Sequence, residues 1–159
     1  MTSLRDQLIL HESLKLKPYR CTAGKLTWGV GYNITARGLK PLNKILGLNI
    51  TDPSQLAKLP REAALAVLDW DIADTTEKLM LRLPWMESLD AVRQKVLIDM
   101  AFNLGVPGLM KFKNTLRAVR EARYSDAAAG MTASLWFKQT KSRALRLRRM
   151  MLTGEDYTS

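Results

Sequence analysis

The stretch HESLKLKPYRCTAGKLTWGVGYN, residues 11–33, is where the chain changes from helical to extended structure, and it holds the only histidine and the only cysteine. Pro18 disfavours helix in the residue before it, so the short N-terminal helix is expected to end near Lys17. Beyond that point, glycines alternate with β-branched and aromatic residues, a pattern typical of short strands joined by tight turns. We therefore predict a β-hairpin region over residues 19–34.

The remainder of the chain has a helical period. Apolar residues recur every three or four positions between two prolines, which predicts a helix of about twenty residues over 61–83. A denser apolar pattern over residues 88–104 is typical of a helix at the centre of a helical lobe. Residues 40–60 form the longest linker-like stretch. Shorter helices are expected at about 112–122, 125–135 and 141–152.

These patterns predict one domain of the α+β, mainly helical class with two lobes. A small hairpin-bearing lobe is expected over about residues 13–60. The helix over 61–83 would link it to a larger all-helical lobe, over about 84–159, that also receives the N-terminal helix.

Composition limits the function classes. The chain has 159 residues, with 25 Lys plus Arg against 15 Asp plus Glu and a net charge of +10. This excess of positive charge favours an anionic partner such as nucleic acid, acidic lipid or a negatively charged polymer. A single cysteine excludes an intramolecular disulfide. No apolar run is long enough for a signal peptide or a membrane span, so we expect synthesis in a cytoplasm.

Two reactive arrangements around the histidine and the cysteine are disfavoured. Zinc sites draw several ligands from His and Cys, and the chain offers one of each, so no metal site is expected. A nucleophilic pair of Cys21 and His11 would need the N-terminal helix to present its histidine to the hairpin. We prefer the interpretation of His11 as a packing or solvent-facing side chain.

Glu12 is the stronger candidate for chemistry. On a helix it would have Leu8 one turn before it and Leu16 one turn after it, at the margin of an apolar face. Apolar surroundings disfavour the ionised carboxylate, as a general acid requires. The alternative is a surface carboxylate that offsets Lys15 and Lys17. Residue periodicity alone leaves both interpretations open.

The spacing of Glu12, Cys21 and Thr27 resembles the Glu-x8-Asp/Cys-x5-Thr signature of the phage lysozymes of the T4 type, or endolysins. SLDAVRQKVLIDMAFNLGVPGLMKFKNTLRAVREARYSDAAAGM and SLWFKQTKSRALRLRRMMLTGE also resemble later segments of that family, in the same order. The resemblance implies a two-lobed lysozyme fold and a monomer. It also implies hydrolysis of the β-1,4 bond between N-acetylmuramic acid and N-acetylglucosamine in bacterial peptidoglycan, without a cofactor.

The resemblance also implies a role for each residue of the signature. Glu12 would protonate the leaving oxygen, while Cys21, in place of the commoner aspartate, and Thr27 would hold a water on the opposite face of the sugar, giving inversion. A thiol has a reference pKa of about 8.5, and Arg20 and Lys25 are expected to favour the thiolate. A covalent route through Cys21 would give retention instead and stays open.

Further site residues are implied by the resemblance. Gly29 and Gly31 are expected to let the hairpin backbone approach the sugar. Tyr32 stands where the best-known member has a histidine, which suggests a hydrogen bond to Asp71. The expected substrate contacts are Asn33, Phe102, Asn103, Thr115, Gln139 and Arg143.

The basic excess is concentrated near the C-terminus, over residues 138–149. A terminal helix with one solvated face explains it, and binding to anionic outer-membrane lipid is the sharper hypothesis. An endolysin without a signal peptide would act in the periplasm after a holin opens the inner membrane. The alternative function is a basic helical nucleic-acid-binding protein, which leaves the spacing of the signature unexplained.

Overall fold

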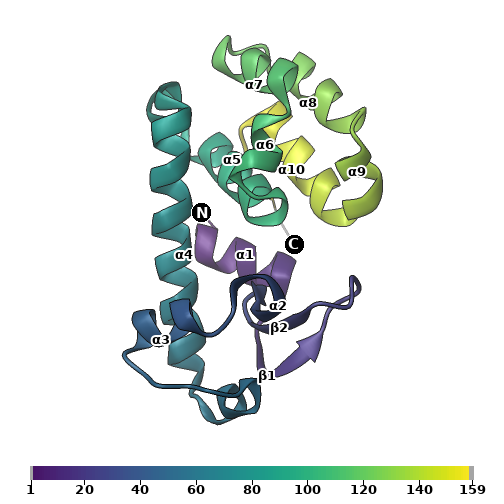
Figure 1. Ribbon diagram of the computed structural model, residues 1–159. Helices are drawn as coiled ribbons and strands as arrows, with labels where there is room; N and C mark the ends of the chain where they lie inside the picture. The colour runs from purple at the N-terminus through teal and green to yellow at the C-terminus, as the bar shows by residue number, and fades with distance from the viewer. Residues whose placement is uncertain (1, 158–159) are drawn as a thin grey trace. The chain divides into compact units, whose positions relative to one another are not determined.

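The computed structural model describes residues 2–157 and is mainly helical with one small antiparallel sheet, which confirms the predicted α+β class (Figure 1). The chain forms two compact units that meet in sequence within the long helix α4 (Arg61–Arg82). We call Arg5–Asp74 the hairpin unit. We call the part from Thr75 onwards, together with the residues up to Leu4, the helical unit.

The first helix ends earlier than predicted. Helix α1 covers Leu4–Glu12, and strand β1 (Lys15–Arg20) begins after two connecting residues. Ser13 adopts a left-handed conformation with φ of 65°, and its N–H donates to the Ile9 carbonyl at 2.9 Å. A left-handed residue just past a helix ends it, so the expected continuation to Lys17 is wrong.

The sheet has three strands in the order β1-β2-β3, with β2 at Leu26–Gly29 and β3 at Tyr32–Asn33. Tyr19 lies opposite Thr27, and the register of β1 shifts between Lys15 and Tyr19. Pro18 falls within this irregular part of an edge strand, where a missing N–H donor is tolerated. Pro18 therefore does not mark a helix boundary here.

The segment expected as a linker over residues 40–60 is ordered by side-chain hydrogen bonds. The Asn43 amide donates to the Ile50 carbonyl at 2.9 Å and accepts from the Ile50 N–H at 2.7 Å. Asp52 caps the next helical turn, with its side chain accepting from the Ser54 N–H at 3.0 Å. The segment contains two elements, α3 (Lys40–Leu46) and η1 (Pro53–Lys58), and follows the short helix α2 (Ile34–Arg37).

The core of the hairpin unit forms around Trp28, which is fully buried. The Trp28 indole N–H donates to the Leu16 carbonyl at 3.1 Å, so it joins β2 to β1. Leu42 and Leu56, from the segment expected as a linker, are also fully buried in this core. The segment therefore contributes to the stability of the unit.

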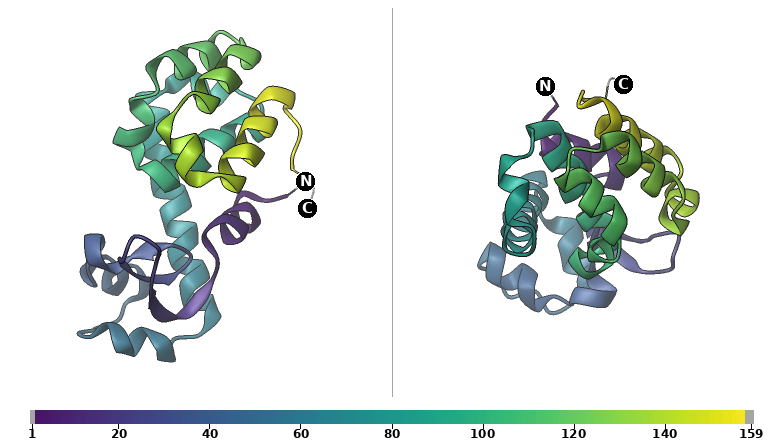
Figure 2. Two further views of the ribbon diagram at one scale, coloured as in Figure 1. Left: turned by 90° about the vertical axis from the view of Figure 1, so that its right-hand side faces the viewer. Right: turned by 90° about the horizontal axis from the view of Figure 1, so that it is seen from above.

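The helical unit packs around α5 (Ala91–Leu104), eight of whose residues are buried. In the helical unit, α8 contacts α7 and also contacts α10 (Figure 2). Within residues 2–157, no helix is long and apolar enough to cross a membrane. The other elements are η2 (Pro84–Ser88), α6 (Val106–Met110), α7 (Lys113–Arg120), α8 (Tyr124–Thr132), α9 (Leu135–Thr140) and α10 (Ser142–Thr153).

Helix α5 also joins the two terminal segments, which lie together in Figure 2. The Lys95 ammonium donates to the Thr2 carbonyl at 2.6 Å and pairs with the Asp156 carboxylate. The same carboxylate accepts from the Thr2 N–H at 3.1 Å. We call Lys95, Thr2 and Asp156 the terminal clamp.

Candidate active site

One face of the sheet carries Thr27, a residue of the signature. Tyr19 and Thr27 are cross-strand partners, so their side chains share a face, and Cys21 comes directly after the end of β1. Trp28, next to Thr27, points to the opposite face and into the core. The strand period therefore presents Thr27 to the site while Trp28 anchors the strand.

Glu12 reaches this part of the unit from the end of α1. Its side chain is half-buried and lies directly against the backbone of Gly31, in the turn between β2 and β3. The helix end and the sheet thus bring a carboxyl group and a hydroxyl group into the same unit. This placement suits the acid function expected of Glu12.

Thr27 has a defined hydrogen-bond orientation. It is 5% exposed, and its hydroxyl donates to the Lys25 carbonyl at 3.0 Å. Because a hydroxyl has one proton and two lone pairs, this bond leaves Thr27 as an acceptor. It can therefore accept a hydrogen bond from a water molecule.

Cys21 is a partly exposed free thiol at the start of the β1–β2 turn. Backbone hydrogen bonds from Lys25, then from Ala23, lower its pKa. The positive charges of the Arg20 and Lys25 side chains, which were expected to lower this pKa, do not contribute to the shift. The Arg20 guanidinium is instead bonded to the Gly24 carbonyl at 3.1 Å. The turn backbone therefore favours the thiolate.

Tyr19 is a site residue that the sequence analysis missed. Its pKa is raised by burial first, then by the negative charges of Glu12 and Cys21. The Glu12 carboxylate and the Cys21 thiolate therefore both disfavour ionisation of the Tyr19 phenol. The Lys15 ammonium lies 4.3 Å from the centre of the Tyr19 ring. The position of Tyr19 opposite Thr27 depends on the strand register, which the sequence did not reveal.

The predicted hydrogen bond between Tyr32 and Asp71 is wrong. The Tyr32 hydroxyl donates to the Gly38 carbonyl at 2.9 Å. Asp71 is held by Arg37 through two hydrogen bonds of 2.8 and 2.9 Å, and the same guanidinium stacks 4.2 Å from the Tyr32 ring centre. A guanidinium donates two parallel hydrogen bonds to a carboxylate, whereas a phenol has only one proton to donate.

The structure gives Asn33 and Asn103 local partners. Asn33 is the N-cap of α2, and its side-chain oxygen accepts from the Ala36 N–H at 2.9 Å. Asn103 accepts from the Trp136 indole at 2.7 Å. Phe102, beside it, is partly buried against the helical core, so each has a structural function besides any contact with substrate.

Arg143 and Gln139 differ in their availability. Gln139 is exposed on α9. Arg143 is 8% exposed, and its Nε donates at 2.7 Å to Asp99, which is fully buried. A second bond joins Arg143 to the Asp99 backbone carbonyl at 3.3 Å. The sequence analysis did not identify Asp99, which neutralises the arginine expected to bind substrate.

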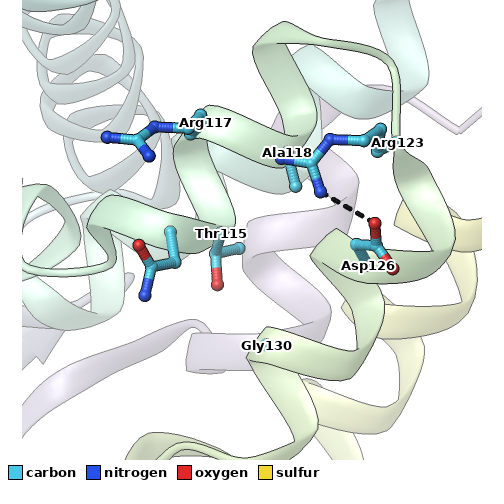
Figure 3. A pocket seen from close by; sticks show the side chains of 7 residues that line it. Thr115, Arg117, Ala118, Arg123, Asp126 and Gly130 are labelled. Carbon is cyan, nitrogen blue, oxygen red and sulfur yellow. Dashed lines mark hydrogen bonds and ion pairs between the residues drawn. The ribbon is translucent and has the colours of Figure 1, made fainter.

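Thr115 lines a pocket of about 270 Å³ between α7 and α8 (Figure 3). It is 6% exposed, and a methyl group on Gly130 would lie 2.3 Å from its hydroxyl oxygen. Arg123 and Asp126 form an ion pair of 2.7 Å at the rim. The pocket therefore depends on glycine at position 130, and Thr115 is close to that position.

Hydrolysis of a glycoside needs an acid and a second group that activates or holds water. Glu12 is a group of the first kind, and Thr27 and Cys21, in the same compact unit, are candidates for the second. A family model described as phage lysozyme matches residues 10–151. The chain belongs to the phage lysozyme family.

Relatives cover the chain almost completely. The pre-baseplate central spike protein Gp5 of Enterobacteria phage T4 is 32% identical over 96% of this chain, which spans 28% of that protein. Probable T4-type lysozymes 1 and 2 of Dictyostelium discoideum are 27% and 29% identical over 97% of this chain and 96% of their own lengths. The chain is thus similar both to whole proteins and to one part of a larger protein.

Proposed function

We propose that the chain is a muramidase that hydrolyses the β-1,4 bond between N-acetylmuramic acid and N-acetylglucosamine in peptidoglycan. The observation that carries the proposal is the gathering of Glu12, Cys21 and Thr27 in one compact unit of a phage lysozyme family member. Two relatives matched over nearly their full lengths are named as probable T4-type lysozymes.

In this reaction Glu12 protonates the oxygen of the leaving sugar. Glycoside hydrolysis needs such an acid, because the departing alkoxide is otherwise a poor leaving group. The contact with the Gly31 backbone and the rigid end of α1 limit where the carboxyl can lie. An acid fixed in this way loses little entropy when the bond breaks.

The attacking water is held by Thr27 and Cys21. Thr27 accepts one hydrogen bond from the water, because its own proton is donated to the Lys25 carbonyl. Cys21, whose pKa is lowered by the turn backbone, supplies the negative charge that the commoner aspartate provides. Water attack from the face opposite Glu12 gives inversion.

Alkylation of Cys21 tests the proposed thiolate. Because the pKa is lowered, the thiolate forms at lower pH, and the iodoacetamide reaction should reach half its maximal rate below the value of about 8.5 for an ordinary thiol. The single cysteine makes the readout specific. Thr27→Val should keep the midpoint below the ordinary value, since the backbone hydrogen bonds remain. A wild-type midpoint at or above that of free cysteine contradicts this assignment.

The bond specificity is tested by digesting purified peptidoglycan and reducing the newly formed sugar ends with borohydride. Digestion followed by reduction and acid hydrolysis should convert N-acetylmuramic acid residues to the alcohol and leave N-acetylglucosamine unreduced. Reduced glucosamine would indicate cleavage of the other glycosidic bond. Absence of new reducing ends, together with salt-sensitive binding to duplex DNA, would favour a nucleic-acid-binding function.

We further propose that the enzyme serves host cell lysis, acting on the wall after a holin-type pore releases it.

The outer face of α9 and α10 supports an affinity for anionic surfaces. No acidic residue occurs over residues 127–154, while Lys138, Lys141 and Arg149 are exposed. Leu145 and Leu152 are 49% and 46% exposed beside them. The opposite face of α10 is buried in the core of the helical unit.

Vesicle binding by the folded chain tests this surface. We expect co-sedimentation with phosphatidylglycerol vesicles that is lost at high salt, and none with neutral phosphatidylcholine vesicles. Charge reversal by Lys138→Glu and Arg149→Glu should abolish it. Equal binding to both vesicle types, or binding that survives charge reversal, would contradict an electrostatic surface.

A further inference from the structure

Gly31 lies directly against the carboxyl group of Glu12. It occupies the turn between β2 and β3 with φ of +70°, a backbone conformation that favours glycine. A methyl group at this position would lie 2.7 Å from Oε2, 3.0 Å from Cδ and 3.2 Å from Cβ of Glu12. All three distances are shorter than an ordinary van der Waals contact between heavy atoms. Because Gly31 has no side chain, the Glu12 carboxyl group can occupy the space beside it.

The turn that carries Gly31 is flanked by buried residues of the hairpin unit. At Gly29, a methyl group would meet the Ala64 side chain of α4 at 3.4 Å. Val30, between the two glycines, is 7% exposed. Trp28 and Tyr32, which pair across the turn, are 0% and 2% exposed. A group added at position 31 will therefore move the Glu12 carboxyl, which ends a flexible side chain, before it moves the turn.

We propose that Gly31 is a positioning residue that seats the Glu12 carboxyl for proton transfer. The inference rests on the proposed function, in which Glu12 is the acid. The turn backbone forms one wall for the carboxyl group, and its distance from α1 fixes how far the group can swing. A wall of this kind acts in the reaction step more than in substrate binding, because it orients the proton donor.

Gly31→Ala tests the proposal, and Gly47→Ala is the matched control. Gly47 also has a positive φ, +65°, at the end of α3, and a methyl group there would meet nothing within 4 Å. Both variants carry the same kind of backbone strain, but only the first displaces Glu12. We expect Gly31→Ala to lower kcat at least tenfold with KM within about twofold, and Gly47→Ala to keep the wild-type kcat. Equal kcat values for the two variants overturn the proposal.

A double-mutant cycle identifies the route of the effect. If Gly31 acts through the carboxyl group, Gly31→Ala should not lower the residual turnover of Glu12→Gln further. The same fold-loss in both backgrounds, with a raised KM, would mean that residue 31 contacts the sugar instead, and the proposal fails. If Glu12→Gln itself keeps wild-type turnover, it is the proposed function that fails.

A stability measurement covers the case in which Gly31→Ala does not fold. Glu12→Ala removes Oε2 and Cδ, the two closest atoms of the contact. The Glu12→Ala/Gly31→Ala double variant should then fold, with a melting temperature lower than that of Glu12→Ala by no more than Gly47→Ala costs the wild type. A double variant that still fails to fold shows that position 31 clashes with something other than the carboxyl group and overturns the proposal.

Discussion

Glu12→Gln is expected to lower turnover on peptidoglycan by about 10²–10⁴-fold, the usual contribution of a general acid. Glutamine keeps the size of the side chain but has no proton to give to the leaving oxygen. The measurement is the initial rate of release of reducing ends, with circular dichroism to show that the variant is folded. The effect should fall on kcat, because the missing proton transfer belongs to the reaction step.

Two variants serve as comparisons for Glu12→Gln. Cys21→Ala should retain more activity, since Thr27 still accepts a hydrogen bond from the water, and Glu62→Gln, an exposed carboxylate on α4, should match the wild type. Equal and near-complete losses for Glu12→Gln and Cys21→Ala would count against the water-holding function and favour a nucleophilic thiol. A large loss for Glu62→Gln would show that carboxylate charge in general, rather than Glu12, supports activity.

Lys95→Met is expected to destabilise the helical unit strongly, although it lies outside the apolar core. Lys95 and Asp156 have side chains only 10% and 16% exposed, so removing the ammonium leaves a carboxylate and the Thr2 carbonyl poorly solvated. Breaking a fully buried pair costs about 3–5 kcal/mol, and partial exposure reduces this to about 2–4 kcal/mol here. For a chain of this length, that lowers the melting temperature by about 5–15 °C.

The terminal clamp is tested by thermal unfolding of three variants. Lys138→Met, an exposed lysine on α9, should melt within about 2 °C of the wild type, as surface changes do. Adding Asp156→Asn to Lys95→Met should recover part of the lost stability, because it removes the unpaired charge. If Lys95→Met melts like Lys138→Met, the clamp does not stabilise the unit.

Periodicity predicted the elements whose burial is regular along the chain. The hairpin was predicted from its glycines and β-branched residues, and α4 from an apolar residue at every third or fourth position. The end of α1 was not predictable, because it depends on the left-handed conformation of Ser13. The helices within residues 40–60 were missed because their order depends on hydrogen bonds of Asn43 and Asp52, which carry no apolar period.

The candidate site was predictable where spacing along one segment determines it. Glu12, Cys21 and Thr27 lie within 16 residues of one another in sequence. Pairs distant in sequence were not predictable. Asp99 holds Arg143 from another helix, and Arg37 takes the partner expected for Tyr32. Such pairs depend on packing, which one sequence does not reveal.

In the proposed reaction, Glu12 donates a proton while Thr27 and Cys21 hold the attacking water. The most direct test is proton NMR of the reducing ends formed in the first minutes of digestion of a soluble peptidoglycan fragment, before mutarotation. Water attack opposite the leaving group predicts that the α anomer of N-acetylmuramic acid forms first. Initial formation of the β anomer would contradict this mechanism and indicate a double displacement with net retention.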